Sequence, residues 1–123
     1  MTPKELVREW IRRFNTGDVE GLAALYAPDA VNHQVVMEPL RGRAEIREMF
    51  LVKLGRAKMV CSEENLLESG DWAVLEWSDP LGLRDGFFQV KDGQIVVQRR
   101  YFDQLTFFRI QNLPFPESYL GEK

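Results

Sequence analysis

The 123-residue sequence has only one cysteine, Cys61, and one histidine, His33. A single cysteine cannot form an intramolecular disulfide, and neither residue has companions at the spacing of a zinc site. We therefore expect no metal and no cofactor. The sequence also has no apolar run long enough to span a membrane and no apolar signal-peptide core at its start. These absences favour a cytoplasmic protein without a membrane partner.

The sequence has no excess of basic residues either. It contains 16 Lys and Arg against 19 Asp and Glu, for a net charge of −3. The acidic and basic residues are interspersed, and the pairs Arg12-Arg13 and Arg99-Arg100 are typical of solvated charges or ion pairs. We therefore expect no nucleic-acid partner. The length and the 45% hydrophobic content predict one globular domain, residues 1–123.

The first half of the sequence has the apolar periodicity of three short helices. The first helix is predicted to begin at the capping box Thr2-Pro3-Lys4-Glu5. Asp18 is expected to cap the second helix, which should stop at Pro28. The third helix is predicted over residues 43–54. A short strand over residues 30–36 is expected between the last two helices.

The second half of the sequence predicts a sheet. Four strands separated by short turns indicate an antiparallel meander, with Gly86 as a possible bulge. The predicted strands cover residues 57–68, 72–78, 83–90 and 94–108. Helices followed by strands are typical of an α+β fold with the helices on one face of the sheet. Residues 112–123 form a predicted C-terminal tail.

The last predicted strand carries an acidic residue among aromatic side chains. Strand alternation places every second residue on one face, and both faces begin apolar and end polar or aromatic. The residues predicted to share a face with the carboxylate are Ile95, Val97, Arg99, Tyr101 and Asp103. Such a strand is typical of one that leaves a core to become the wall of a cavity, so we expect Asp103 to reach a pocket.

Several segments together resemble the SnoaL-like branch of the nuclear transport factor 2-like superfamily, which also contains ketosteroid isomerase and limonene epoxide hydrolase. The matching segments are Phe14-Asn15-Thr16-Gly17-Asp18, Leu25-Tyr26-Ala27-Pro28-Asp29-Ala30, Gly42-Arg43-Ala44-Glu45-Ile46, Gly70-Asp71, Trp72, Trp77, Asp92-Gly93-Gln94-Ile95 and Tyr101-Phe102-Asp103. The resemblance covers residues 4–110. It implies a cone-shaped α+β barrel, with three N-terminal helices packed on a strongly curved, mainly antiparallel sheet around an apolar cavity.

The resemblance also implies a homodimer formed through the outer face of the sheet. Trp72 and Val74 are expected to face outward and to leave an apolar surface there. Leu75 and Trp77 are expected to face inward.

The resemblance implies that Asp103 acts as a general acid or base. A carboxylate in an apolar cavity is desolvated, so its pKa rises and it can transfer protons near neutral pH. The alternative is a structural ion pair with Arg99 or Arg100. His33 matches a histidine that tends to line the cavity, where it could shuttle protons, or it is an ordinary strand histidine. Tyr101 could assist by stabilising an enolate.

The remaining predicted pocket residues have side chains long enough to reach the cavity or to lie over its mouth. They are Tyr26, Trp77, Arg99, Met37 and Leu75. The aromatic ones could equally be core residues with satisfied polar groups.

The predicted function is that of a cofactor-free acid/base enzyme, an isomerase or a cyclase, acting on a small hydrophobic carbonyl compound. The alternative is a non-catalytic module that binds a hydrophobic ligand or supports dimerisation. A third possibility is water activation as in limonene epoxide hydrolase, through a triad Asp85-Arg99-Asp103. This superfold hosts many activities, so the site and not the fold must decide among them.

Overall fold

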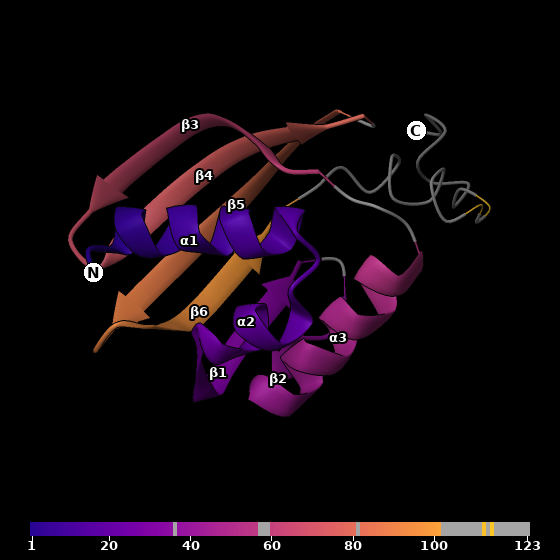
Figure 1. Ribbon diagram of the computed structural model, residues 1–123, viewed down its shortest axis with the longest axis horizontal. Helices are drawn as coiled ribbons and strands as arrows, with labels where there is room; N and C mark the ends of the chain where they lie inside the picture. The colour runs from indigo at the N-terminus through magenta and orange to yellow at the C-terminus, as the bar shows by residue number, and fades with distance from the viewer. Residues whose placement is uncertain (36, 57–59, 81, 102–111, 113, 115–123) are drawn as a thin grey trace, which may run out of the picture.

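The computed structural model describes residues 1–35, 37–56, 60–80, 82–101, 112 and 114. In this part of the chain three helices lie against one face of a curved six-stranded sheet (Figure 1). The helices are α1 (Pro3–Asn15), α2 (Val19–Ala24) and α3 (Arg43–Arg56). The strands are β1 (Tyr26–Gln34), β2 (Leu40–Arg41), β3 (Ser62–Ser69), β4 (Trp72–Asp79), β5 (Gly82–Lys91) and β6 (Gln94–Arg100). None of the described helices is long and apolar enough to cross a membrane.

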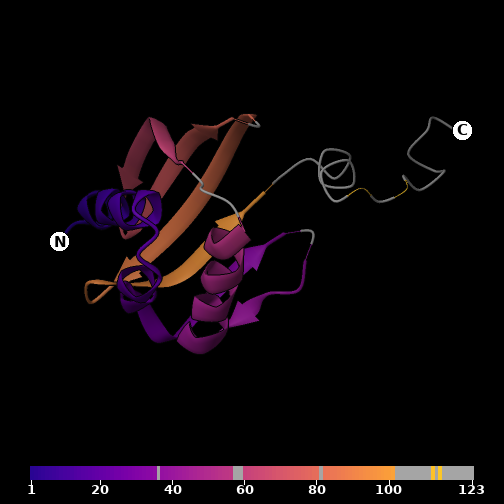
Figure 2. The same ribbon diagram turned by 45° about the vertical axis from the view of Figure 1, so that its right-hand side comes forward.

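The strands are ordered β2-β1-β6-β5-β4-β3 across the sheet. Strands β3 to β6 form the predicted antiparallel meander, while β1 pairs in parallel with β6. Helix α1 contacts β3, β4 and β5, and α3 contacts β1 and β2 (Figure 2). The predicted α+β cone, with its helices on one face of the sheet, is therefore confirmed.

Local sequence signals fix the starts of the first two helices as predicted. The Thr2 side chain accepts the Glu5 backbone N–H at 3.1 Å, and the Glu5 carboxylate accepts the Thr2 N–H at 2.8 Å. The Asp18 carboxylate accepts the Gly21 N–H at 2.9 Å and caps α2. The capping box at Thr2 and Glu5 begins α1, whose buried stripe includes Trp10 and Phe14.

Strand β1 begins earlier than predicted and takes residues expected in the second helix. Tyr26 pairs with Ile95, but the next paired residue of β1 is Val31, opposite Val97. Pro28 lies in this irregular stretch, where a residue without an N–H removes no ladder hydrogen bond. The prediction that Pro28 ends a helix was therefore wrong, because the helix has already ended at Ala24.

The predicted bulge at Gly86 is also wrong. Gly86 pairs in regular register with Leu75. A Cβ atom at residue 86 would lie 2.8 Å from Cε1 of Phe88, so the glycine makes room for this buried ring.

The bulge lies on β6 instead and changes which residues face the helices. Val90 pairs with Ile95 and Gln89 with Val97, so Val96 is an extra residue in β6. Strand alternation is shifted by one residue beyond this point. The predicted faces of residues 97–101 were therefore wrong.

The core between α1, α3 and the sheet is rich in aromatic side chains. The Trp10 ring stacks on Phe14 with centroids 5.0 Å apart, and Phe50 and Phe88 meet Trp10 edge-on. Phe14 also meets Trp77 edge-on at 5.9 Å. These contacts join rings from α1, α3, β4 and β5 into one aromatic cluster in the core.

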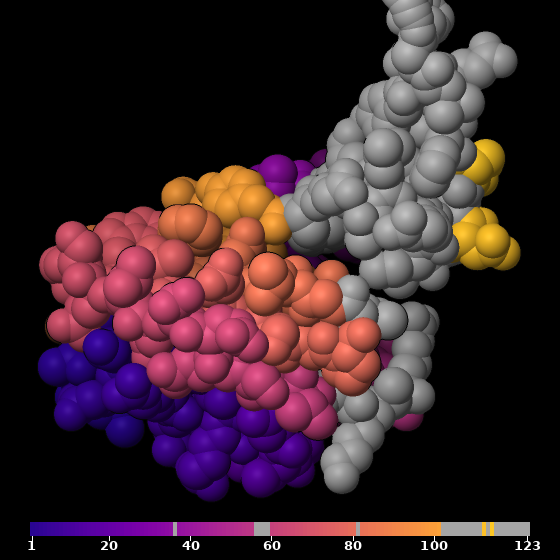
Figure 3. Space-filling model, turned by 90° about the horizontal axis from the view of Figure 1, so that it is seen from above, coloured from indigo at the N-terminus to yellow at the C-terminus, as the bar shows by residue number. Residues whose placement is uncertain are grey.

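On β4 the inward and outward residues follow the prediction. Leu75 and Trp77 are buried, and Glu76 is exposed. Figure 3 shows the outer surface from above, with the residues of β3 to β6 side by side in pink to orange.

Only residues 112 and 114 of the predicted tail, residues 112–123, are among those described, so the tail's role stays a prediction.

Candidate functional site

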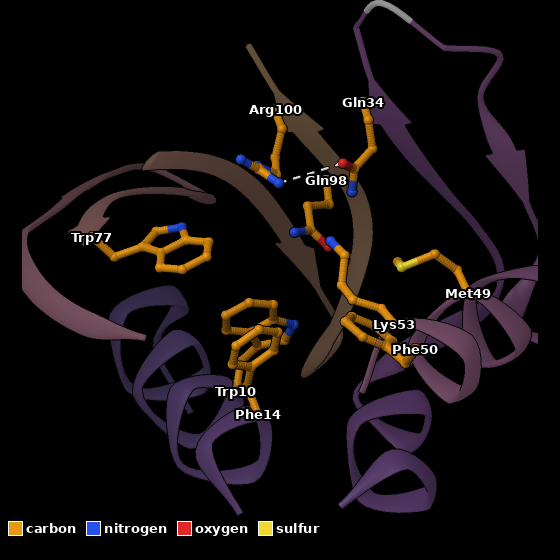
Figure 4. Close-up of a pocket in the computed structure, with 9 residues that line it drawn as sticks. All are labelled: Trp10, Phe14, Gln34, Met49, Phe50, Lys53, Trp77, Gln98 and Arg100. Atoms are coloured by element: carbon orange, nitrogen blue, oxygen red, sulfur yellow. Dashed lines mark hydrogen bonds between the residues drawn. The ribbon is translucent and has the colours of Figure 1, made fainter. Parts of the chain in front are cut away.

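A pocket opens between α1, α3 and strands β1, β4 and β6 (Figure 4). It measures about 280 Å³ including its open mouth. Its enclosed part, with the side chains as they stand, has room for about one water molecule. The lining residues are Trp10, Phe14, Gln34, Met49, Phe50, Lys53, Trp77, Gln98 and Arg100. A larger ligand requires the long side chains at the mouth to move aside.

The floor of the pocket is aromatic. Trp10 and Phe14 lie one turn apart on α1, and Phe50 faces them from α3 (Figure 4). Trp77 closes the far side from β4. Such a surface suits the flat, apolar part of a small molecule.

A buried hydrogen-bond network fixes the orientation of Gln98. Trp10 Nε1 donates to Tyr26 Oη at 3.0 Å, and the Tyr26 hydroxyl donates to Gln98 Oε1. Asn32 Nδ2 donates to the same oxygen at 3.0 Å. Burial raises the pKa of Tyr26, which keeps this phenol protonated as a donor. The Gln98 oxygen therefore receives two donors, and its amide nitrogen is left as the group available to the pocket.

Arg100 lies above Gln98 on the same face of β6. Its Nη1 donates to Gln34 Oε1 at 3.4 Å, and its Nε donates to the backbone oxygen of Asp85 at 3.2 Å. Its guanidinium carbon lies 5.7 Å from the centre of the Trp77 ring. Burial, followed by the positive charge of Arg84, lowers the pKa of Arg100.

Lys53 reaches from α3 toward Gln98 (Figure 4). Burial lowers its pKa from 10.5 to about 8, and the positive charges of Arg100 and Arg84 add to this effect. Asp79 opposes the shift, but its carboxylate lies 3.1 Å from Arg84 Nε. Among the described residues Lys53 has no hydrogen-bond or ion-pair partner. We call Lys53, Gln98 and the aromatic floor the donor pocket.

The two described residues of the predicted catalytic set do not line the donor pocket. His33 pairs with Arg99 across β1 and β6 and shares its outer face. Tyr101 is 47% exposed, and its ring meets Phe87 edge-on at 5.5 Å. Asp103 lies outside the described residues. The bulge in β6 explains why the alternation predicted for Tyr101 was wrong.

The predicted pocket residues have different positions. Trp77 lines the donor pocket. Tyr26 and Leu75 are fully buried in the core, where Tyr26 supports Gln98. Met37 is 52% exposed on the loop before β2. Arg99 is exposed on the outer face, so its predicted place in the pocket was wrong for the same reason as that of Tyr101.

The described members of the predicted epoxide-hydrolase triad lie on the outer face of the sheet. The guanidinium carbon of Arg99 lies 5.6 Å from the centre of the Trp72 ring. Asp85 pairs with the exposed Glu76, and its carboxylate accepts the Tyr101 backbone N–H at 2.9 Å. These two residues therefore do not supply water activation to the donor pocket.

Sequence reasoning missed Lys53, Gln98, Gln34 and Arg100. Lys53 did leave a signal, because it lies one turn after Met49 within the apolar side of the third helix. The two residues of β6 could not be assigned without the position of the bulge. No group of three or more His, Cys, Asp or Glu residues in the described part of the chain is placed to hold a metal.

The family model of the SnoaL-like domain matches residues 7–98, which include α1 from residue 7 onward, all of α3, and Gln98. The chain belongs to the SnoaL-like family. No curated protein matches it. The family match covers every residue of the donor pocket, while Arg100, which also lines the opening, lies outside the match.

Solved structures share the fold of this SnoaL-like protein at low sequence identity. A proposed polyketide cyclase from Pseudomonas putida is 21% identical, with a TM-score of 0.75 over 89% of this chain and 97% of its own. An LEH-like epoxide hydrolase from M. tuberculosis is 23% identical, with a TM-score of 0.74 over 85% of each chain. A Catenulispora acidiphila protein with a ketosteroid isomerase-like fold, in complex with trimethylamine, is 16% identical, with a TM-score of 0.73 over 93% of this chain and 96% of its own.

Proposed function

We propose that this SnoaL-like protein is a cofactor-free enzyme that transfers a proton on a small hydrophobic carbonyl compound bound in the donor pocket. The observation that carries the proposal is that two donors without a partner in the described part of the chain, Lys53 Nζ and Gln98 Nε2, lie beside an aromatic floor. The proposed polyketide cyclase from Pseudomonas putida, a structure of the same fold, supports this class of reaction.

The donors suit the charge that develops when a proton leaves the carbon next to a carbonyl group. The electron pair of the broken C–H bond moves to the carbonyl oxygen, which becomes an enolate. A protonated Lys53 and the Gln98 amide can hold this oxygen. The enolate then takes a proton at another carbon, as in an isomerisation, or its carbon attacks a second carbonyl, as in a cyclisation.

The base in this proposal is Asp103, as the sequence predicts. A carboxylate accepts the proton from the substrate carbon and returns it at the end of the reaction. Lys53 stays protonated through the step, because its role is to stabilise the oxygen. Activity should therefore fall as the pH rises above about 8, where Lys53 loses its proton.

The test is deuterium incorporation into 2-tetralone in D₂O, followed by proton NMR. We expect the wild type to exchange the protons next to the carbonyl faster than buffer does. Asp103→Asn and Lys53→Met should each lower the rate, while Lys91→Met, which removes an exposed lysine at the end of β5, should not. Exchange at the buffer rate with the wild type, over a panel of cyclic and aryl ketones, would overturn the proposal.

The second candidate is a binding module without catalysis. It is favoured by one observation: the described residues that line the donor pocket include no carboxylate and no imidazole. A module of this kind would be stabilised by ligands and would exchange no protons. The same NMR experiment, run beside thermal unfolding with each ketone, separates the two candidates.

A further inference from the structure

The polar atoms of the donor pocket that have no partner among the described residues are hydrogen-bond donors. The Gln98 side chain is 3% exposed, its oxygen accepts from Tyr26 and Asn32, and its nitrogen has no partner among the described residues. Lys53 Nζ likewise has none and points toward Gln98 (Figure 4). Both unpartnered groups are donors, so the ligand atom that satisfies them must be an acceptor.

The charge around these donors favours an anionic acceptor over a neutral one. Lys53 is desolvated, and its pKa is lowered further by Arg100 on β6 and Arg84 on β5. The nearby carboxylate, Asp79 on β4, is already ion-paired with Arg84. A buried cation is costly until an opposite charge compensates it. An anion beside Lys53 therefore gains more here than it would at an exposed lysine.

The floor of the donor pocket limits the shape of the ligand. Trp10 and Phe14 stack with their ring planes 16° apart, and Phe50 and Trp77 meet them edge-on. Aromatic rings from α1, α3 and β4 therefore bound the pocket on three sides, which suits an aromatic ring of the ligand. The donors lie at one end of this surface (Figure 4).

We infer that the donor pocket takes a flat ring compound bearing a delocalised oxyanion, either an aryl carboxylate or the enolate of a cyclic 1,3-dicarbonyl compound. The inference rests on the proposed function in that it names the chemical class of ligand that the same pocket holds, and the enolate formed by proton transfer is one member of that class. Its oxygen binds Lys53 Nζ and Gln98 Nε2, and its ring lies on the aromatic floor.

The first experiment compares matched anionic and neutral probes by titration calorimetry at pH 7. The carboxylate pair is 2-naphthoate and 2-naphthamide, and the enolate pair is 4-hydroxycoumarin and coumarin. We expect at least one anion to bind roughly ten- to one-hundredfold more tightly than its neutral partner, as for a charge-assisted hydrogen bond. The pair with the larger difference identifies the source of the oxyanion.

Two variants test whether Lys53 and Gln98 cause the preference for the anionic probe. Lys53→Met should remove most of the preference for the anion and leave the neutral probe nearly unchanged, whereas Lys91→Met should change neither. Gln98→Glu keeps an oxygen for Tyr26 and Asn32 but places a second, charged oxygen toward Lys53. This variant should fold and bind the preferred anion at least one-hundredfold more weakly than the wild type.

Equal binding of anion and neutral partner in both pairs, or no binding of any probe, would overturn the inference. Anion binding that survives both Lys53→Met and Gln98→Glu would overturn it as well. The outcome is separable from the proposed function. Anion binding without proton exchange on any ketone would support the inference about the ligand and contradict the proposed enzymatic function. Proton exchange on neutral ketones without a preference for anions would support the enzymatic function and contradict the inference about the ligand.

Discussion

Replacing Lys53 by methionine should make the protein more stable at neutral pH. Lys53 carries its charge into a pocket floored by aromatic rings, and Arg100 and Arg84 repel it while Asp79 attracts it less strongly. Methionine has nearly the same helix propensity as lysine and fills similar space without a charge. The variant therefore removes an electrostatic cost and leaves the helix intact.

The size of the effect follows from the pKa. A fall from 10.5 to about 8 corresponds to about 3 kcal/mol of lost stability wherever Lys53 is protonated in both the folded and the unfolded state. The Lys53 side chain keeps some exposure at the pocket mouth and can move toward solvent, so we expect the variant to gain about 1–3 kcal/mol. For a domain of this size that is a rise in Tm of roughly 3–15 °C.

The pH dependence gives the sharper assay. The pKa of Lys53 is lower in the folded than in the unfolded state, so its cost is fully present below pH 8 and disappears as the pH rises toward 10.5. Urea unfolding of wild type and Lys53→Met at pH 7 and pH 10 should therefore show a difference that shrinks with pH. Lys91→Met is the exposed control. A variant that is less stable than the wild type at pH 7, or a difference that does not change with pH, would refute the reasoning.

Three further predictions concern the frame around the donor pocket. Tyr26→Phe removes the hydroxyl that supports Gln98, and urea unfolding should show a loss of about 1–3 kcal/mol; unchanged stability would contradict the network. The Asn15 side chain accepts the Cys61 N–H at 2.6 Å and donates to the Cys61 backbone oxygen at 2.9 Å. Asn15→Ala should therefore lower the free energy of unfolding by about 1–3 kcal/mol in the same assay. An unchanged free energy of unfolding would contradict this link between α1 and the segment before β3. We propose, as the sequence predicts, that two copies pair through the outer face of the sheet, so Val74→Lys should turn a dimer into a monomer in sedimentation; a monomeric wild type would exclude this pairing.

The helices could be predicted from the sequence because their signals are local. Thr2, Glu5 and Asp18 cap residues three positions away, and the apolar stripe of α1 repeats at the spacing of one helical face. The order of the strands in the meander could also be predicted from the sequence, because short turns at Gly70 and Gly93 join strands that pair with each other.

Most of the candidate site could not be predicted from the sequence, because one extra residue in β6 reverses which of the following side chains face the helices. Val96 is inserted between two paired positions, so Gln98 and Arg100 face the helices while Arg99 faces out. A bulge depends on pairing between strands and leaves no distinct local signature. The burial of Lys53 is also a tertiary property, since helix α3 places it but the strands across the pocket remove it from water.

A crystal structure of the protein grown with 2-naphthoate would show whether the donor pocket binds the ligand. We expect the naphthalene ring against the aromatic floor that includes Trp10, Phe14 and Trp77, with a carboxylate oxygen within about 3 Å of both Lys53 Nζ and Gln98 Nε2. A naphthoate bound on the outer face of the sheet, or a donor pocket left without ligand at concentrations that saturate the protein in solution, would contradict it.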